Sequence, residues 1–176
     1  MLTGFERLRQ TSSELVVAQE INRLLTDGLP LEEFCPALIV WICYNVSDID
    51  SGLIFVREFS GEEFTLLDNY GVTTTMKNLG SGHPIVKYLK DRIAEEKTKS
   101  EIVADSEKIT FLLSDMGTAE KLMLLLLIIE TDLLGFILLL NRKEKEVYTP
   151  GITDLLNSIT DQVARAVKSI QTRPLK

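Results

Sequence analysis

The sequence predicts one α+β domain with a central, mostly antiparallel sheet of five to six strands and helices packed on it. Three observations lead to this prediction. The length of 176 residues fits one domain. Short apolar or β-branched runs come in pairs joined by tight turns, which favours antiparallel pairing. The two ends of the chain repeat apolar residues at helical steps, and we expect these terminal helices to be adjacent.

The first half of the chain is predicted to hold two helices and a hairpin. Gly28 and Pro30 end the first helix and start the second. Ser60 and Gly61 form the tight connection between the two strands of the hairpin. In order, the two helices and two strands are expected at residues 5–27, 31–46, 53–56 and 63–70. The glycine-bearing stretch 71–82 is predicted to be a loop.

The second half is predicted to begin with a helix at Pro84, because proline is tolerated in the first turn. Residues 122–129 and 133–140 are continuous apolar runs, so we expect two strands covered on both faces. The polar triplet 130–132 between them argues against a membrane span, which needs about 20 apolar residues. A short strand is expected at 102–105, a helical turn at 110–116, and a final helix from Thr149.

Charge and cysteine content exclude several classes of protein. The net charge is −7 and the basic residues are scattered, which argues against binding to nucleic acid or to an anionic membrane surface. Cys35 and Cys43 lie eight residues apart on a predicted helix, a rise of about 12 Å. A disulfide cannot bridge that distance. We therefore expect two buried thiols in the reducing cytoplasm.

Two late segments carry a resemblance to a known family. The run Leu133 to Leu139 is similar to the "iGvL" strand of GAF domains. Tyr148-Thr149-Pro150 and the helix after it are similar to the closing helix of that family. With the order of the elements, nearly the whole chain resembles the GAF domains of bacterial or archaeal signalling proteins, a GAF/PAS-like fold. We divide this single domain into an N-terminal helix (1–28), a core (29–148), a C-terminal helix (149–171) and a tail (172–176).

The resemblance implies a ligand pocket between one face of the sheet and the segment 70–116 above it. Candidate ligand-binding residues there are Tyr70, His83, Asp105 and Asp115. The alternative for His83 is a polar residue that closes a helix N-terminus, and the alternative for the other three is a surface turn residue. His83 is the only histidine and has no nearby Cys, Asp or Glu, which makes a poor metal site. The predicted pocket region has no cysteine for attaching a bilin. No haem, bilin or metal is supported, and the cofactor stays unknown.

The last helix shows the 3.5-residue repeat of a helix seam. We predict a homodimer held by the two terminal helices. The interface residues on which the prediction rests are Leu8, Leu15, Leu156, Ile159, Val163 and Ile170. The alternative is that this stripe packs on the sheet of its own chain.

These observations predict a cytoplasmic, non-catalytic sensory domain. It would bind an unidentified small molecule and signal through a helical dimer to a fused or separate output domain. An alternative is a degenerate GAF-like domain that serves only dimerisation or protein interaction. A remote alternative is an enzyme similar to free methionine sulfoxide reductases. Those relatives use cysteines in the pocket loops, whereas Cys35 and Cys43 lie on the early helix.

Overall fold

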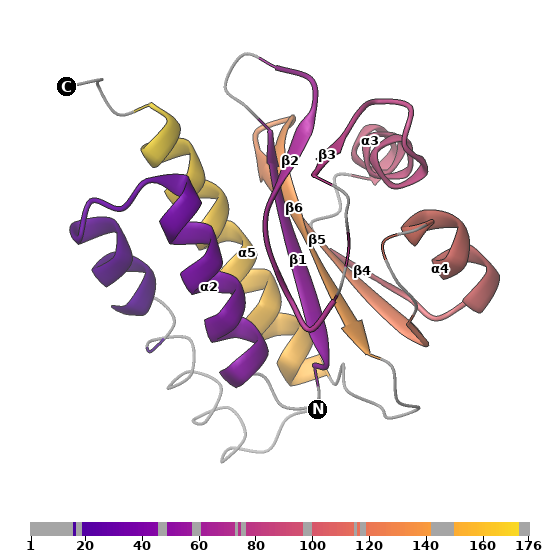
Figure 1. Ribbon diagram of the computed structural model, residues 1–176, viewed down its shortest axis with the longest axis horizontal. Helices are drawn as coiled ribbons and strands as arrows, with labels where there is room; N and C mark the ends of the chain where they lie inside the picture. Colours follow the sequence, from indigo (N-terminus) through magenta and orange to yellow (C-terminus); the bar gives the residue numbers. More distant parts are fainter. Residues whose placement is uncertain are drawn as a thin grey trace.

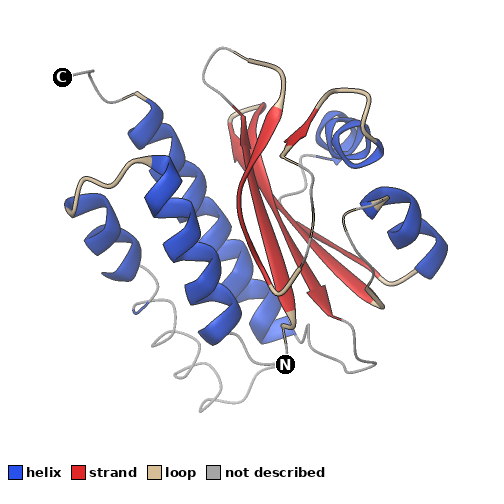
Figure 2. Ribbon diagram, viewed as in Figure 1, coloured by secondary structure: helices blue, strands red, loops and turns tan. Residues whose placement is uncertain are grey.

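The computed structural model describes residues 16, 19–45, 49–57, 61–72, 74, 77–96, 100–114, 116, 119–141 and 150–172 (Figures 1 and 2). Its centre is a six-stranded sheet with the strand order β3-β2-β1-β6-β5-β4, and each neighbouring pair is antiparallel. The strands are β1 (Ser51–Arg57), β2 (Phe64–Tyr70), β3 (Asn78–Leu79), β4 (Ser100–Val103), β5 (Lys121–Ile129) and β6 (Asp132–Asn141). The predicted α+β class and antiparallel sheet are confirmed.

Helices cover both faces of the sheet (Figure 1). One face carries α2 (Leu31–Asn45) and α5 (Pro150–Gln171), and the other carries α3 (Pro84–Glu96) and α4 (Ser106–Leu113). Side chains alternate along each strand, so Ile54 in β1 is buried towards α2 and α5 while Phe55 is buried towards α3 and α4. This two-sided burial explains why the strands 122–129 and 133–140 are apolar without interruption.

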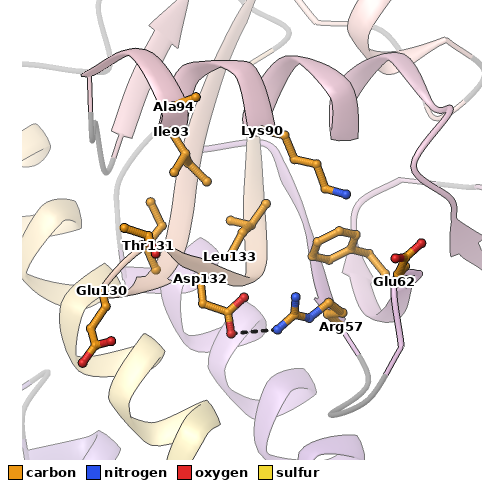
Figure 3. A pocket seen from close by; sticks show the side chains of 11 residues that line it. Arg57, Glu62, Lys90, Ile93, Ala94, Glu130, Thr131, Asp132 and Leu133 are labelled. Carbon is orange, nitrogen blue, oxygen red and sulfur yellow. Dashed lines mark hydrogen bonds and ion pairs between the residues drawn. The ribbon is translucent and has the colours of Figure 1, made fainter.

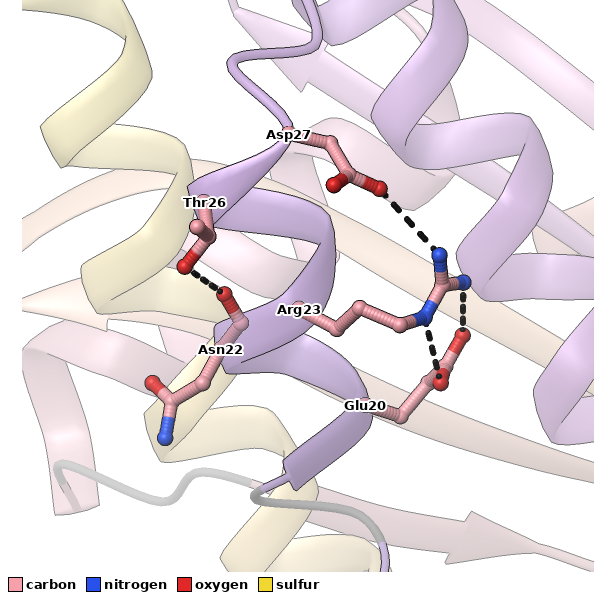
Figure 4. Close-up of polar contacts among 5 residues, drawn as sticks. All are labelled: Glu20, Asn22, Arg23, Thr26 and Asp27. Atoms are coloured by element: carbon pink, nitrogen blue, oxygen red, sulfur yellow. Dashed lines mark hydrogen bonds and ion pairs between the residues drawn. The ribbon is translucent and has the colours of Figure 1, made fainter.

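The described part of the N-terminal helix lies on the same face as α5. Residues 19–26 are helical, and Ile21 and Leu24 belong to the buried cluster that also contains residues of α2 and α5. The outer side of this helix is polar: Arg23 contacts both Glu20 and Asp27 (Figure 4). Exposed pairs of this kind contribute about 0–1 kcal/mol, so apolar burial holds the helix in place. Leu8 and Leu15 lie outside the described residues.

Two elements differ from the expectations. Within the predicted loop 71–82, Asn78 and Leu79 form the short strand β3 beside β2. The expected turn at 110–116 is instead the eight-residue helix α4, which starts at Ser106. Its start was missed because the first helical residues are polar and show no apolar repeat. No helix in the described part of the chain combines the length and apolarity needed to cross a membrane.

A charged cleft at one end of the sheet

The face of the sheet under α3 and α4, where the pocket was predicted, has a close-packed apolar interior. Its buried cluster draws on all six strands and on both helices. The largest members are Phe55, Phe64 and Phe136. The ring centroids of Phe55 and Phe136 are 5.0 Å apart, and those of Phe64 and Phe136 are 5.3 Å apart. The first pair is stacked and the second is tilted, and the three rings lie within the buried cluster on this face.

The predicted ligand-binding residues are not brought together on this face. Tyr70 ends β2 with 39% of its surface exposed. His83 lies just before α3, and Ile85 lies in the first turn of that helix. Nδ1 of His83 accepts a hydrogen bond from the backbone N–H of Ile85 at 3.3 Å. Asp105 is the N-cap of α4 and accepts from the N–H groups of Glu107 and Lys108 at 2.9 and 3.2 Å. Asp115 lies outside the described residues.

His83 therefore matches its alternative role at a helix N-terminus, whereas the N-cap role of Asp105 was not among the roles expected for it. A side-chain acceptor at this position satisfies N–H groups that have no partner in the first turn. Neither residue, nor Tyr70, lines the cleft described below.

The residues assigned to the dimer seam also need correction. Leu156, Ile159 and Val163 are fully buried inside the single chain, in the cluster between α5 and the sheet. Ile170 packs against the same cluster and is partly buried. The 3.5-residue stripe is thus core packing, because a helix lying on a sheet needs the same apolar face as a helix pairing with its twin.

A carboxylate fastens α3 and α4 to the edge of the sheet. Glu101 of β4 accepts a hydrogen bond from the Tyr88 hydroxyl at 2.5 Å and forms an ion pair with Arg92 Nε at 2.9 Å. Lys108 of α4 lies 3.7 Å from Glu101 and also stacks over the Tyr88 ring, 4.6 Å from its centroid. Burial and the bond to Glu101 raise the pKa of the Tyr88 hydroxyl. This cluster closes the outer side of the apolar interior.

The candidate site is a cleft of about 730 Å³ at one end of the sheet (Figure 3). It lies between α3, the turn joining β5 to β6, and the ends of β1 and β2 that meet there. Its lining consists of Arg57, Glu62, Phe64, Lys90, Ile93, Ala94, Ile128, Glu130, Thr131, Asp132 and Leu133. The volume and the mixture of apolar walls with a few charged groups are typical of small-molecule sites.

Arg57 is the central charged group of the cleft. It is the last residue of β1, and alternation along the strand places its side chain on the α3 side. Its Nη2 donates to Asp132 at 2.8 Å. Its Nε is buried and has no hydrogen-bond partner among the described residues. Lys90 lines the same cleft, and its side chain extends from α3 (Figure 3). The cleft therefore offers cationic donors beside apolar walls.

The main chain of Arg57 is tied to the other face of the sheet. The side-chain amide of Gln171, the last residue of α5, donates to the Arg57 carbonyl at 2.7 Å. The β6 ladder ends one residue earlier, at Val56 paired with Gly135. One residue thus contributes its side chain to the cleft and its carbonyl to the end of α5.

The two cysteines lie away from the cleft, in the cluster on the α2 side. Both are buried free thiols. Burial raises the pKa of each thiol to about 12, so both are protonated at neutral pH and are poor nucleophiles. Among the described residues, no group of three or more His, Cys, Asp or Glu side chains is placed to hold a metal ion.

The cleft residues were missed because they come from distant positions in the sequence. Arg57, Lys90 and Asp132 belong to β1, α3 and the start of β6, and nothing in their spacing connects them. One signal was available: the polar triplet 130–132 was recognised as a hairpin turn, and a turn at the end of an apolar sheet is a natural place for a charged pocket rim.

Comparisons with known proteins agree on the fold. The sequence matches no protein-family model and no curated protein. The GAF domain of an Acinetobacter phosphoenolpyruvate-protein phosphotransferase is similar in structure, with a TM-score of 0.72, 12% identity, and coverage of 96% of this chain and 95% of that chain. A phycoerythrobilin-bound GAF domain of a cyanobacterial phytochrome has a TM-score of 0.71 and 14% identity, with coverage of 89% of this chain and 95% of that chain.

An enzyme is also among the similar structures. The type II free methionine-R-sulfoxide reductase of Thermoplasma acidophilum has a TM-score of 0.62 and 16% identity, covering 80% of this chain and 96% of that chain. Similarities at such low sequence identity show the fold alone, and an activity has to be argued from the residues of the site. The strand order, the helices on both faces and these similarities together show that the chain has a GAF-like fold.

Proposed function

We propose that this chain is a non-catalytic sensory or regulatory domain that binds a small molecule in the charged cleft. The cleft itself carries the proposal. It combines a volume of about 730 Å³ with apolar walls, an arginine held by an ion pair and a lysine. Ligand sites are usually preformed hollows of this size with a few placed polar groups. A GAF-like fold is compatible with sensing, and the small molecule is unidentified.

The chemistry of the described residues supports a binding role over a catalytic one. Cys35 and Cys43 are the only cysteines of the chain, and burial keeps both in the thiol form. They also lie across the sheet from the cleft. A thiol enzyme similar to the reductases would need an accessible thiolate at its site. The two free thiols also support a cytoplasmic location.

A substitution that fills the cleft tests the binding proposal. Ala94 lines the cleft from α3, and Ala94→Trp is expected to occupy much of its volume. Native mass spectrometry of the purified chain, followed by thermal-shift screening of small metabolites, would identify a bound molecule. We expect Ala94→Trp to lose this binding.

Asp91→Trp is the matched control, because Asp91 is exposed on the same helix and is not part of the cleft. It should bind as the wild type does. A ligand that binds both variants equally would place the site elsewhere, and the absence of any ligand would favour the second candidate function.

That second candidate is a domain that only dimerises or binds another protein. The observation in its favour is the apolar cluster beneath α3 and α4, in which the rings of Phe55, Phe64 and Phe136 are in contact. In both proposals the chain is a homodimer that acts on a fused or separate output domain. The dimer contact is then expected on an exposed helix face, since the α5 stripe is buried within the chain.

A further inference from the structure

We propose that the cleft takes a small carboxylate with an apolar group, and that Arg57 transmits its binding to the C-terminal end of α5. The inference rests on the proposed binding function. It adds the chemical class of the ligand and a physical route from the cleft to the helix on the opposite face of the sheet.

The ligand class follows from the donors in the cleft. Nε of Arg57 is buried without a hydrogen-bond partner among the described residues. A buried donor without an acceptor is unfavourable, so the site favours a molecule that brings an oxygen to this point. Lys90 lines the same cleft from α3 and supplies a second positive charge. Charge-assisted hydrogen bonds from two cations fit an oxyanion.

The acidic residues of the cleft limit how much negative charge the ligand carries. Glu62, Glu130 and Asp132 also line it. Asp132 is already paired with Arg57 at 2.8 Å, and Glu130 points away from the guanidinium in Figure 3. A phosphate monoester carries about −1.5 to −2 at neutral pH and would be repelled more strongly than a singly charged carboxylate. The monoanion is therefore the better match.

The apolar walls define the rest of the ligand. Phe64, Ile93 and Leu133 line the cleft between the charged groups. A short hydrocarbon chain attached to the carboxylate would bury against them and would contribute favourably in proportion to the area removed from water. A fatty acid or a branched organic acid of about six carbons would fit in the cleft, whose volume is within the usual range of ligand sites. Such a molecule is smaller than the cleft, so water would occupy the remaining space.

The route to α5 passes through the backbone of Arg57. Its side chain lies in the cleft, and its carbonyl accepts from Gln171 Nε2 at 2.7 Å. These two residues are 114 positions apart in the chain. Arg57 pairs with Phe64 of β2 but lies beyond the last β1–β6 pair, so the sheet holds its peptide group on one side only. A ligand that fixes the guanidinium also restrains this peptide and strengthens the contact that holds the last turn of α5.

Three probes of equal length test the ligand class: hexanoate, 1-hexanol and hexylamine. We expect NMR titration of the full chain to show binding of hexanoate and much weaker binding of the other two. Arg57→Lys and Lys90→Gln should each weaken hexanoate binding by about tenfold, as expected for the loss of one charge-assisted hydrogen bond. Lys87→Gln, on the exposed side of α3, should leave it unchanged. Binding of hexylamine in preference to hexanoate would overturn the assignment.

Hydrogen exchange of the backbone amides tests the coupling. Hexanoate is expected to slow exchange at residues 166–171 in the wild type. Gln171→Ala should abolish this slowing while keeping hexanoate affinity within about threefold, because Gln171 does not line the cleft and a coupling of this size is small. Gln162→Ala is the matched control on the same helix. Its side chain bonds to Ser158 within α5, so the response should persist.

The outcomes separate the two proposals. If hexanoate binds and the end of α5 does not respond, or responds equally in Gln171→Ala, the coupling is wrong and the binding function stands. If Ala94→Trp and the wild type both fail to bind any small molecule, the binding function itself is wrong. Loss of hexanoate binding in Lys87→Gln as well as in Lys90→Gln would show that the effect is not specific to the cleft, and would overturn the ligand assignment.

Discussion

Gly135 lies where β6 passes closest to β1, opposite Val56. A Cβ at this position would lie 2.3 Å from the Phe55 carbonyl oxygen, a distance at which the two strands must separate. We expect Gly135→Ala to lower the free energy of unfolding by about 2 kcal/mol, within the usual range for overpacked sites. Chemical denaturation measures the change. Gly80→Ala is the control, since a Cβ there meets no atom within 4 Å; equal losses in both variants would contradict the packing argument.

Cys35 makes stability depend on alkaline pH. Burial raises its pKa to about 12, whereas an unfolded chain has a cysteine pKa of about 8.5. Between these values the unfolded chain loses the proton and the folded chain keeps it. The stabilisation is therefore complete below about pH 8.5 and declines as the pH rises towards 12. One thiol accounts for a slope of about 1.4 kcal/mol per pH unit.

Urea unfolding at several pH values above 8.5 checks this prediction. Cys35→Ala is less stable throughout, because it removes a buried side chain, but its stability should fall less steeply with pH than that of the wild type. Parallel slopes for the two proteins would show that the Cys35 thiol does not govern the alkaline loss.

At the scale of elements, Glu101 holds two helices on one strand. Its carboxylate contacts Tyr88 and Arg92 of α3 and Lys108 of α4. Glu101→Gln removes the charge from all three contacts, and we expect a loss of about 1–2 kcal/mol with faster hydrogen exchange in α4. Glu20→Gln is the control, because its pair with Arg23 is exposed and such pairs contribute about 0–1 kcal/mol. A larger effect at Glu20 than at Glu101 would refute this view of the cluster.

The long elements were predictable from sequence and the short ones were not. The apolar runs 122–129 and 133–140 predict the bounds of β5 and β6 to within one residue. They do so because strands buried on both faces are apolar at nearly every position. β3 is only Asn78–Leu79, too short for any periodicity. α4 depends on Asp105 as its cap, and the same aspartate had been considered as a ligand contact. Composition alone does not separate these two roles.

The site was less predictable than the fold for a physical reason. The apolar face of a helix repeats in consecutive turns of one element, so it can be recognised in the sequence. The cleft instead depends on Arg57, Lys90 and Asp132, which come from three different elements. The stripe on α5 showed the converse difficulty. Leu156, Ile159 and Val163 have the spacing of a helix seam, and the structure places them against the sheet. Spacing identifies an apolar face and leaves its partner undetermined.

At the scale of the whole molecule, the outer side of α2 is the expected dimer contact. Val40 and Tyr44 lie one turn apart and expose 44% and 82% of their surfaces. We predict that the wild type is a dimer by light scattering, and that Val40→Asp with Tyr44→Asp yields a folded monomer, because unpaired negative charges would enter an apolar contact.

Phe111→Asp is the control for this experiment. Phe111 is 66% exposed on α4, on the opposite face of the sheet, so its replacement should leave the dimer intact. A monomeric wild type would refute the dimer. A dimer that survives the α2 substitutions would move the contact to another surface.

The two outermost strands have a consequence for aggregation. β3 and β4 are two and four residues long, and short edges offer few free peptide groups to a strand from another molecule. The leucine-rich strand β5 lies just inside, where β4 pairs with residues from Leu122 to Leu125. Detachment of β4 would uncover an apolar segment of high β-propensity, the kind that seeds fibrils. We therefore expect the contacts of Glu101, which hold β4 to α3 and α4, to oppose aggregation as well as unfolding.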